Sequence, residues 1–302
     1  AVRGGNPGQM DAQPPVDPAS KVVINEVLAH TDLPQLDTVE LYNGSSQPAD
    51  LSGCVLTDDV QTNRFRIPAG TVLAPGGFLV LDERVLGFRL SAAGESVWLI
   101  SSNGLRVLDV VRFGAQENGV ASGRTPDGAS GWRRLESFTP GKANASRRVE
   151  DVVLNEIMYH PISDDDADEF VEVHNRSSQP VDLDGWRLEQ GVSFTFPAGA
   201  SIPAGGYVVV GRNMERLRAN HTSLTAANSF GNWSGSLRNS GERLSLSKPD
   251  EILSTNSVGQ VSSDTIHIEV CSVDYRDAGR WGQWSGGGGS SMELVDPRAD
   301  PL

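Results

Sequence analysis

The sequence contains the same succession of segments twice. Three blocks recur in the same order at an offset of about 130 residues, which marks the duplication of a whole domain rather than of a short motif. The pairs are VVINEVLAH at 22–30 and VVLNEIMYH at 152–160, VELYNGSSQPADLSG at 39–53 and VEVHNRSSQPVDLDG at 171–185, and FRIPAGTVLAPGGFLVL at 65–81 and FTFPAGASIPAGGYVVV at 194–210. The chain of 302 residues must therefore fold as two copies of one unit.

Within each copy the hydrophobic residues follow the period of β-strands. TVELYN alternates apolar and polar positions, and runs such as GGFLVLD and GGYVVVG are short and follow a turn. Turn sequences such as NGSSQP, PAG and APGG separate these segments, and no long helical pattern alternates with them. The pattern predicts an all-β protein built from two tandem immunoglobulin-like β-sandwiches.

The domain boundaries follow from composition and from the limits of the repeat. We expect a disordered leader at 1–20, a first sandwich at 21–146 and a second at 147–302, with TPGKANASRRVED at 139–151 as the joint. The second copy carries extra residues at about 211–230, which we place in a surface loop. It has no Thr-Pro-Gly-x-x-Asn ending of its own, so we expect either truncation there or a last strand supplied from elsewhere.

These blocks resemble the lamin tail domain from end to end. The similarity runs from INEVLA through GRTPDG to FTPGKAN over about 21–145, and a more divergent copy follows from about 150. One departure is Cys54 where the family usually has Trp, a position that is Trp186 in the second copy. The resemblance implies an immunoglobulin-like sandwich. No coiled-coil heptads flank either copy, which favours the bacterial members found in secreted or surface-attached proteins over a nuclear lamin.

Charge and apolar content restrict the possible partners and location. The formal net charge of −14 repels phosphate backbones, so we expect no binding to nucleic acid. No apolar run approaches the about 18 residues of a transmembrane helix. Because the chain begins at Ala1 with neither Met nor an apolar leader, we expect an extracellular or cell-surface protein whose signal peptide has been removed. Cys54 and Cys271 lie at non-equivalent places, and we interpret them as separate buried thiols.

Two duplicated carboxylates invite a catalytic interpretation. Asn25-Glu26 and Asn155-Glu156 occur at the start of each copy, and Glu40 and Glu172 lie in the next strand. A base or metal ligand is one possibility. The structural alternative, which we prefer, is that the asparagine holds a neighbouring loop and the glutamates lie on the outer, polar side of the sheet.

The strongest candidate metal site is the acidic run SDDDADEF. Carboxylates in a loop are the hard oxygen ligands that Ca²⁺ takes, although the EF-hand pattern is incomplete and charge runs in loops are usually only solvated. The candidate ligands are Asp164, Asp165, Asp166, Asp168 and Glu169. We expect no other cofactor.

An aromatic group close to the C-terminus is the candidate partner-binding site. Tyr275, Trp281 and Trp284 could stack against a carbohydrate or a protein partner, or pack over the end of the sandwich as plugs.

No nucleophile elbow, Cys–His set or phosphate loop is present in the sequence. We therefore expect a non-catalytic extracellular structural or interaction module, acting through protein partners or self-association. The alternative is an accessory region of a larger secreted hydrolase or nuclease, with a role in calcium or carbohydrate binding.

Overall fold

The computed structural model describes residues 17–62, 64–255, 260–279 and 281–296. The chain clusters into two compact units, Ala1–Arg148 (unit 1) and Val149–Leu302 (unit 2), each of which is described by itself. Strands make up 40% of the residues and helices 7%, which confirms the predicted all-β class.

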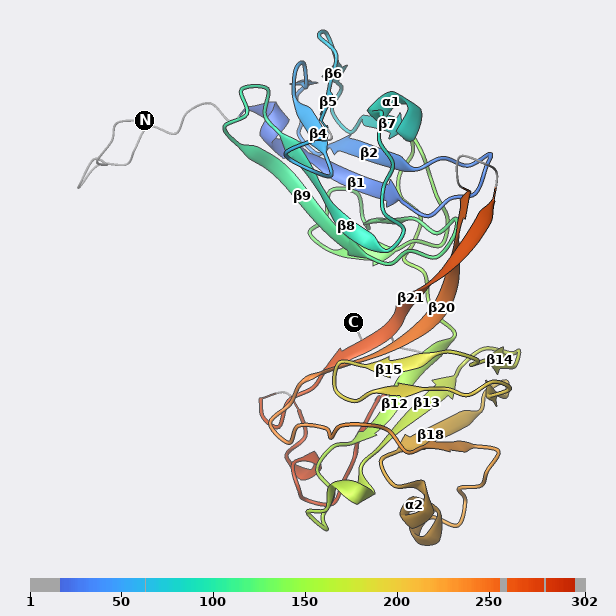
Figure 1. Ribbon diagram of the computed structural model, residues 1–302. Helices are drawn as coiled ribbons and strands as arrows, with labels where there is room; N and C mark the ends of the chain where they lie inside the picture. Colours follow the sequence, from blue (N-terminus) through green and yellow to red (C-terminus); the bar gives the residue numbers. More distant parts are fainter. Residues whose placement is uncertain (1–16, 63, 256–259, 280, 297–302) are drawn as a thin grey trace, which may run out of the picture. The chain divides into compact units, whose positions relative to one another are not determined.

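Unit 1 is an antiparallel β-sandwich (Figure 1). One sheet has the order β11-β10-β1-β2-β7, the other has the order β5-β4-β8-β9, and β3 pairs with β6. Its strands are β1 (Val22–Leu28), β2 (Thr38–Asn43), β3 (Ala49–Asp50), β4 (Val55–Thr57), β5 (Phe65–Arg66), β6 (Val72–Leu73), β7 (Phe78–Asp82), β8 (Gly94–Ile100), β9 (Val107–Gly114), β10 (Ser122–Arg124) and β11 (Trp132–Arg134). Its short helices are η1 (Pro18–Lys21) and α1 (Glu83–Leu86).

The two sheets of unit 1 share one hydrophobic core. Val22 and Ile24 from β1 belong to the same buried cluster as Val97 and Leu99 from β8. Alternate residues of each strand therefore point into the core, as the predicted apolar–polar alternation requires. A second, smaller cluster of Leu28, Ala121 and Leu135 lies apart from this core.

Unit 2 repeats the arrangement with additions. Its sheets have the orders β19-β18-β13-β12-β22 and β16-β15-β20-β21, and β14 pairs with β17. Its strands are β12 (Val152–Met158), β13 (Phe170–Asn175), β14 (Val181–Asp182), β15 (Arg187–Glu189), β16 (Phe194–Thr195), β17 (Ser201–Ile202), β18 (Tyr207–Gly211), β19 (Ser229–Gly231), β20 (Arg243–Thr255), β21 (Val261–Asp274) and β22 (Met292–Glu293). Its helices are η2 (Asp166–Asp168), α2 (Met214–Asn220) and η3 (Gln283–Ser285).

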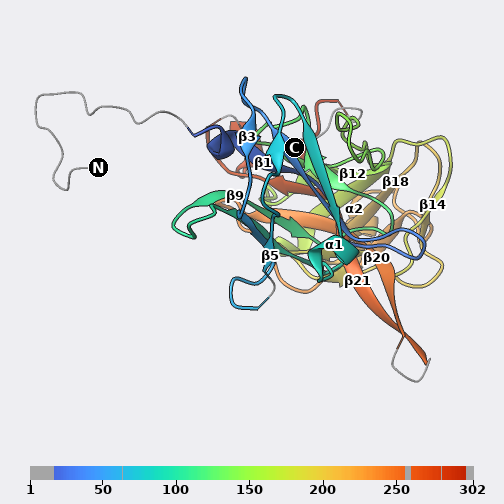
Figure 2. The same cartoon turned by 90° about the horizontal axis from the view of Figure 1, so that it is seen from above.

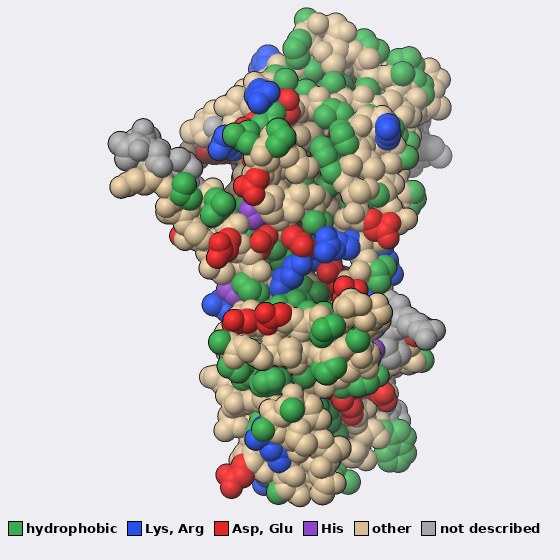
Figure 3. Space-filling model, turned by 90° about the vertical axis from the view of Figure 1, so that its right-hand side faces the viewer, with side chains coloured by type: hydrophobic (Ala, Val, Ile, Leu, Met, Phe, Trp, Pro, Cys, Tyr) green, Lys and Arg blue, Asp and Glu red, His purple; other side chains and the backbone are tan. Residues whose placement is uncertain are grey.

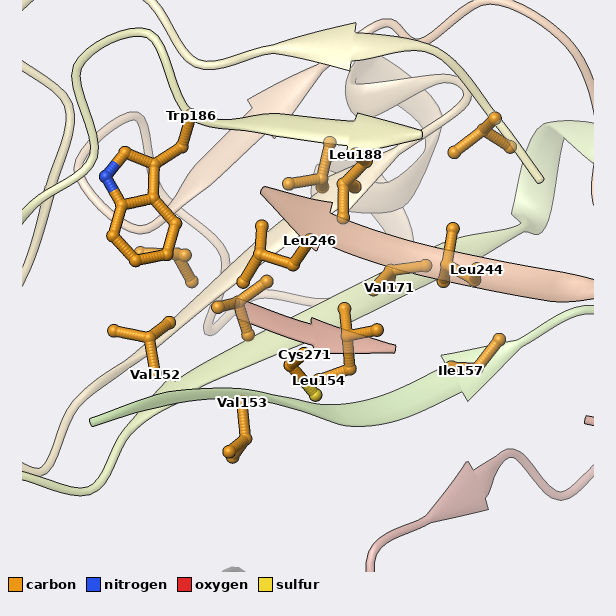
Figure 4. Close-up of a cluster of buried hydrophobic side chains, with 14 of the residues drawn as sticks. Val152, Val153, Leu154, Ile157, Val171, Trp186, Leu188, Leu244, Leu246 and Cys271 are labelled. Carbon is orange, nitrogen blue, oxygen red and sulfur yellow. The ribbon is translucent and has the colours of Figure 1, made fainter. Parts of the chain in front are cut away.

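The core of unit 2 contains Trp186 at the position that Cys54 occupies in unit 1, and both side chains are buried. In Figure 4, Leu154 and Val153 point to opposite sides of β12, as the alternation of a strand requires. Cys271 lies in the same core beside Leu246, and neither it nor Cys54 is in a disulfide bond.

The two longest strands, β20 and β21, form a hairpin that extends out of the sheet of unit 2 (Figures 1 and 2). Their register runs from Arg243 opposite Asp274 to Thr255 opposite Val261. Within the described residues, only Ser245 to Ser247 of β20 also pair with β15. Residues 248–255 and 261–268 thus form a two-stranded ribbon, which is called the ribbon below.

Three details differ from the sequence-based expectation. Residues 1–16 of the expected leader lie outside the described residues, but Pro18–Lys21 form η1, because Asp17 caps it and Ala19 is buried in the core. Arg147 and Arg148 bond to Leu135 and Arg134, so they extend unit 1 by two residues. The insertion at 211–230 is not a plain loop, since it contains α2 and most of β19, which pairs in parallel with β18.

The surface is mixed in character. On the face drawn in Figure 3, hydrophobic side chains form separate patches, and Asp and Glu side chains occur on both units. None of the helices in the described part of the chain has the length and apolar character needed to cross a bilayer.

Candidate functional site

The first two strands of unit 1 place two glutamates side by side. Glu26 of β1 lies directly opposite Glu40 of β2. A β-bulge between Ile24 and Glu26 lets both Asn25 and Glu26 face away from the main core, to which Ile24 and Val27 belong. Like charges opposite each other destabilise a sheet, so this pair requires other partners.

A segment far along the chain supplies those partners. The backbone N–H of Thr139 donates to Oε1 and Oε2 of Glu26 at 3.1 and 3.2 Å. The N–H of Gly141 donates to Oε2 of Glu40 at 2.6 Å. Both glutamates are fully buried. The two glutamates therefore lie on the predicted face of the sheet. The prediction that this face is exposed to solvent was wrong, because residues 125–144, called the cover below, lie over it.

Asn25 fixes the cover in position. Its Nδ2 donates to Asp127 Oδ1 at 3.0 Å, and its Oδ1 accepts the N–H of Gly128 at 3.1 Å. Asn144 donates its N–H to Asp127 Oδ1 at 3.0 Å and its Nδ2 to the carbonyl oxygen of Asn25 at 3.0 Å. The predicted role of this asparagine in holding a loop is thus confirmed.

Gly123 of β10 lets the cover approach the sheet. A Cβ at this position would be 2.7 Å from the carbonyl oxygen of Asn25, 2.8 Å from Nδ2 of Asn144 and 2.9 Å from Cδ1 of Leu135. These separations are shorter than van der Waals contact, so only glycine fits without a shift of the surrounding atoms.

Burial changes the acidity of the pair. Removal from water raises the pKa of Glu26 to about 7; the N–H of Thr139 opposes the rise and the charge of Glu40 adds to it. Burial also raises the pKa of Glu40, against the N–H of Gly141. A perturbed carboxyl can mark a catalytic acid, but both of these side chains are fully buried and hydrogen-bonded to the cover. Their hydrogen bonds hold the cover against the sheet.

Unit 2 repeats the pair with a different environment. Glu156 lies opposite Glu172, again beside a bulge after Leu154. Asn155 Nδ2 donates to Glu172 Oε1 at 2.9 Å, and Ser291 Oγ donates to Glu156. Burial raises the pKa of Glu172. No Thr-Pro-Gly turn lies over this pair among the residues described for unit 2.

The acidic run of unit 2 is engaged by arginines. Arg216 of α2 donates to both carboxylate oxygens of Asp168 at 2.6 Å and to Asp165 Oδ2 at 2.6 Å. Arg212 lies 3.2 Å from Asp166. The hydrogen bonds from Arg216 lower the pKa of Asp168. A calcium ion would have to compete with these two guanidinium groups.

The remaining members of this candidate set point elsewhere. Asp164 Oδ1 lies 3.4 Å from His160 Nε2. Glu169 is fully buried, accepts the N–H of Leu237 at 3.1 Å and has a pKa raised by burial to about 7. In the part of the chain that the structure describes, no three His, Cys, Asp or Glu side chains are grouped to hold a metal ion. Calcium binding by this loop stays a prediction.

The structure separates the three aromatic candidates. Tyr275 is buried and its ring centroid lies 4.7 Å from that of Tyr159, so it belongs to the core. Trp284 is 73% exposed, and Trp281 is half-buried. Trp281 lines a shallow depression of about 620 Å³ together with Ser240, Asp274, Arg276, Asp277, Ala278 and Gly279. Carbohydrate or partner binding at the two tryptophans stays a prediction.

Sequence reasoning missed the residues that complete the glutamate site, which are Thr139, Gly141, Asp127 and Asn144. A signal was present, because unit 1 contains Thr-Pro followed by a glycine turn at both 125–128 and 139–141. It pointed to a turn. It did not indicate which residues the turn would bind.

Comparisons with known proteins give one family. A family model described as Lamin Tail Domain matches residues 15–115 and 145–262, which together are more than half of the chain. No curated protein matches. Among solved structures, a DUF4876 family protein from Bacteroides thetaiotaomicron is similar over 85% of this chain and 78% of that chain, with 12% sequence identity and a TM-score of 0.30.

Proposed function

The chain belongs to the lamin tail domain family, and from this premise we propose that it is a non-catalytic module that makes protein–protein contacts outside the cell or at its surface. Lamin tail domains are immunoglobulin-like sandwiches without catalytic activity, and they generally act as interaction modules. The duplicated glutamates support this assignment, since their hydrogen bonds serve the fold.

The observation that carries the proposal is the ribbon of unit 2. Among the described strands, β21 (Val261–Asp274) is the last in the order of its sheet, with β20 as its neighbour. The side chains of Leu253 and Val261 on the ribbon are 56% and 66% exposed. An edge strand presents backbone N–H and C=O groups to which another strand can add, and exposed apolar side chains strengthen such an addition.

Self-association through the ribbon is the form of contact that we propose. A second copy of the chain offers the same edge, so two ribbons can pair symmetrically. The tandem arrangement of the units would increase the avidity of any further contact. Location outside the cell is part of this proposal and rests on the absence of flanking coiled-coil heptads in the sequence. Immunodetection on unpermeabilised cells of the source organism would test it.

The test is the mass of the full chain in solution, measured by light scattering over a concentration series. In the matched variant, an Asn-Gly turn replaces residues 249–267 and joins Lys248 to Ile268, which are directly opposite in the register. The rest of the sheet of unit 2 is retained. We expect the mass of the natural chain to rise with concentration and that of the shortened chain to stay at one copy.

Two results would count against this function. Equal association of both chains would place the contact elsewhere, and a natural chain that stays monomeric at every concentration would exclude self-association through the ribbon. Repeating the series with Ca²⁺ tests the acidic loop, because calcium-dependent association of both chains alike would point to that loop instead.

A further inference from the structure

The glutamate pair of unit 2 has a counterpart in unit 1, and the groups that bind that counterpart are seen in the structure. In both units the pair follows the same bulge and the same register, with Glu26 opposite Glu40 and Glu156 opposite Glu172. In unit 1 two backbone N–H groups of the Thr139–Gly141 turn bind this pair. Unit 1 therefore shows which ligand the arrangement accepts.

The last described strand of unit 2 shows which described residues correspond to the start of the cover. β22 pairs with β12 as β10 pairs with β1, with Glu293 opposite Glu156 and Gly123 opposite Glu26. By this register Asp296, where the description of unit 2 stops, corresponds to Pro126. No described residue of unit 2 is equivalent to the cover from Asp127 onward.

One atom of unit 2 lacks the partner that its counterpart has. Asn155 is 5% exposed, and its Oδ1 is buried and accepts no hydrogen bond from any described residue. The equivalent Oδ1 of Asn25 accepts the N–H of Gly128 in the cover. The Nδ2 of Asn155 bonds to Glu172, so the orphaned oxygen belongs to the same amide that touches the glutamate pair. A buried acceptor left unpaired destabilises the fold, and a backbone N–H donor would correct this.

We propose that the Glu156–Glu172 pair and Asn155 form a binding site for a Thr-Pro-Gly turn, which a separate peptide with the sequence of the cover can occupy. The ligand is a segment with the chemistry of the cover of unit 1, which donates its backbone N–H groups to the two carboxylates and to the Asn155 amide oxygen. Carboxyl oxygens accept hydrogen bonds from backbone N–H groups, and several such bonds from one turn fix its register on the sheet.

Glu293 lies at the edge of the proposed site and provides a test of it. It stands where unit 1 has Gly123, whose missing side chain makes room for Leu135 and Asn144 of the cover. An incoming segment must push the exposed Glu293 side chain aside. Replacing Glu293 by glycine should therefore tighten binding, and a gain of affinity does not arise from misfolding.

The experiment uses the full chain and a synthetic peptide with the sequence of residues 125–146, titrated by isothermal calorimetry. We expect one peptide per chain. A second peptide carries N-methylglycine at the position of Gly141, which deletes one N–H donor; we expect its binding to be weaker by tenfold or more. In the chain, Glu172→Gln should weaken binding by a similar factor, Glu293→Gly should strengthen it several-fold, and Glu215→Gln, at an exposed position of α2, should leave it unchanged.

Three outcomes would overturn the site. The first is the absence of binding by the unmodified peptide at millimolar concentration. The second is equal affinity of the N-methylated peptide, because the turn would then not be recognised through its N–H group. The third is binding that neither Glu172→Gln nor Glu293→Gly alters, because the peptide would then bind elsewhere on the chain.

Discussion

Replacing Glu26 by glutamine should remove a large part of the pH dependence of the stability of unit 1. In the folded chain burial raises the pKa of Glu26 from 4.5 to about 7, so the folded state favours the protonated carboxyl. The stabilisation from protonated Glu26 is present in full below pH 4.5 and is lost as the pH rises through 7. A glutamine side chain is neutral at every pH and keeps an oxygen for the N–H of Thr139.

The shift sets the size of the effect. At about 1.36 kcal/mol for each pKa unit, it corresponds to about 3 kcal/mol between pH 4 and pH 8. The free energy of unfolding of Glu26→Gln minus that of the natural chain should therefore rise by about 3 kcal/mol over this range.

Urea unfolding of the full chain at several pH values measures this difference. Pulse labelling of amides in residues 17–148, followed by mass spectrometry, separates unit 1 from unit 2. Glu136→Gln, an exposed site in the same unit, is the control and should leave the pH dependence unchanged. Parallel curves for Glu26→Gln and the natural chain would refute the reasoning, since Glu26 would then not be held neutral by burial.

Three further predictions concern other parts of the fold. Gly123→Ala should destabilise unit 1 by about 1–3 kcal/mol through overpacking, while Gly131→Ala, where a Cβ meets nothing within 4 Å, should be close to neutral in the same unfolding assay. Leu246→Ala should lower the stability of unit 2 by about 2–5 kcal/mol because its side chain is fully buried, whereas Leu253→Ala on the exposed ribbon should change it by less than about 0.5 kcal/mol. Asp168→Asn should remove stability that the natural chain shows above pH 3.8 and loses as the pH falls through the lowered pKa, so the two melting curves should converge in acid.

Much of the architecture could be predicted, because each copy repeats the alternation that defines a strand. The repeat predicted the two units, and the strand periodicity within each copy predicted the all-β class. The ribbon could not be predicted in this way. Its strand β20 contains Lys248, Pro249, Asp250 and Glu251, and proline and acidic residues are typical of turns rather than of a 13-residue strand.

The candidate sites were harder to predict, because periodicity gives the face of a strand and not what covers that face. Glu26 and Glu40 were assigned to the correct side of the sheet, yet their burial depends on a segment about a hundred residues away. The acidic loop shows the same limit, since Arg216, which binds Asp165 and Asp168, follows them by 51 and 48 residues. Such partners are brought together by the fold and leave no local pattern.

The cover of unit 1 also determines when this unit can finish folding. Its hydrogen bonds to β1 and β2 join residues that are 101 to 119 positions apart, so these strands leave the ribosome long before Gly141 and Asn144 are synthesised. Contacts of such long sequence separation form late and slow the folding reaction. Until they form, the two glutamates are hydrated, ionised and repel each other across the strands. A nascent chain that ends before Thr139 thus carries all the strands of unit 1 but lacks the donors that make their pairing favourable.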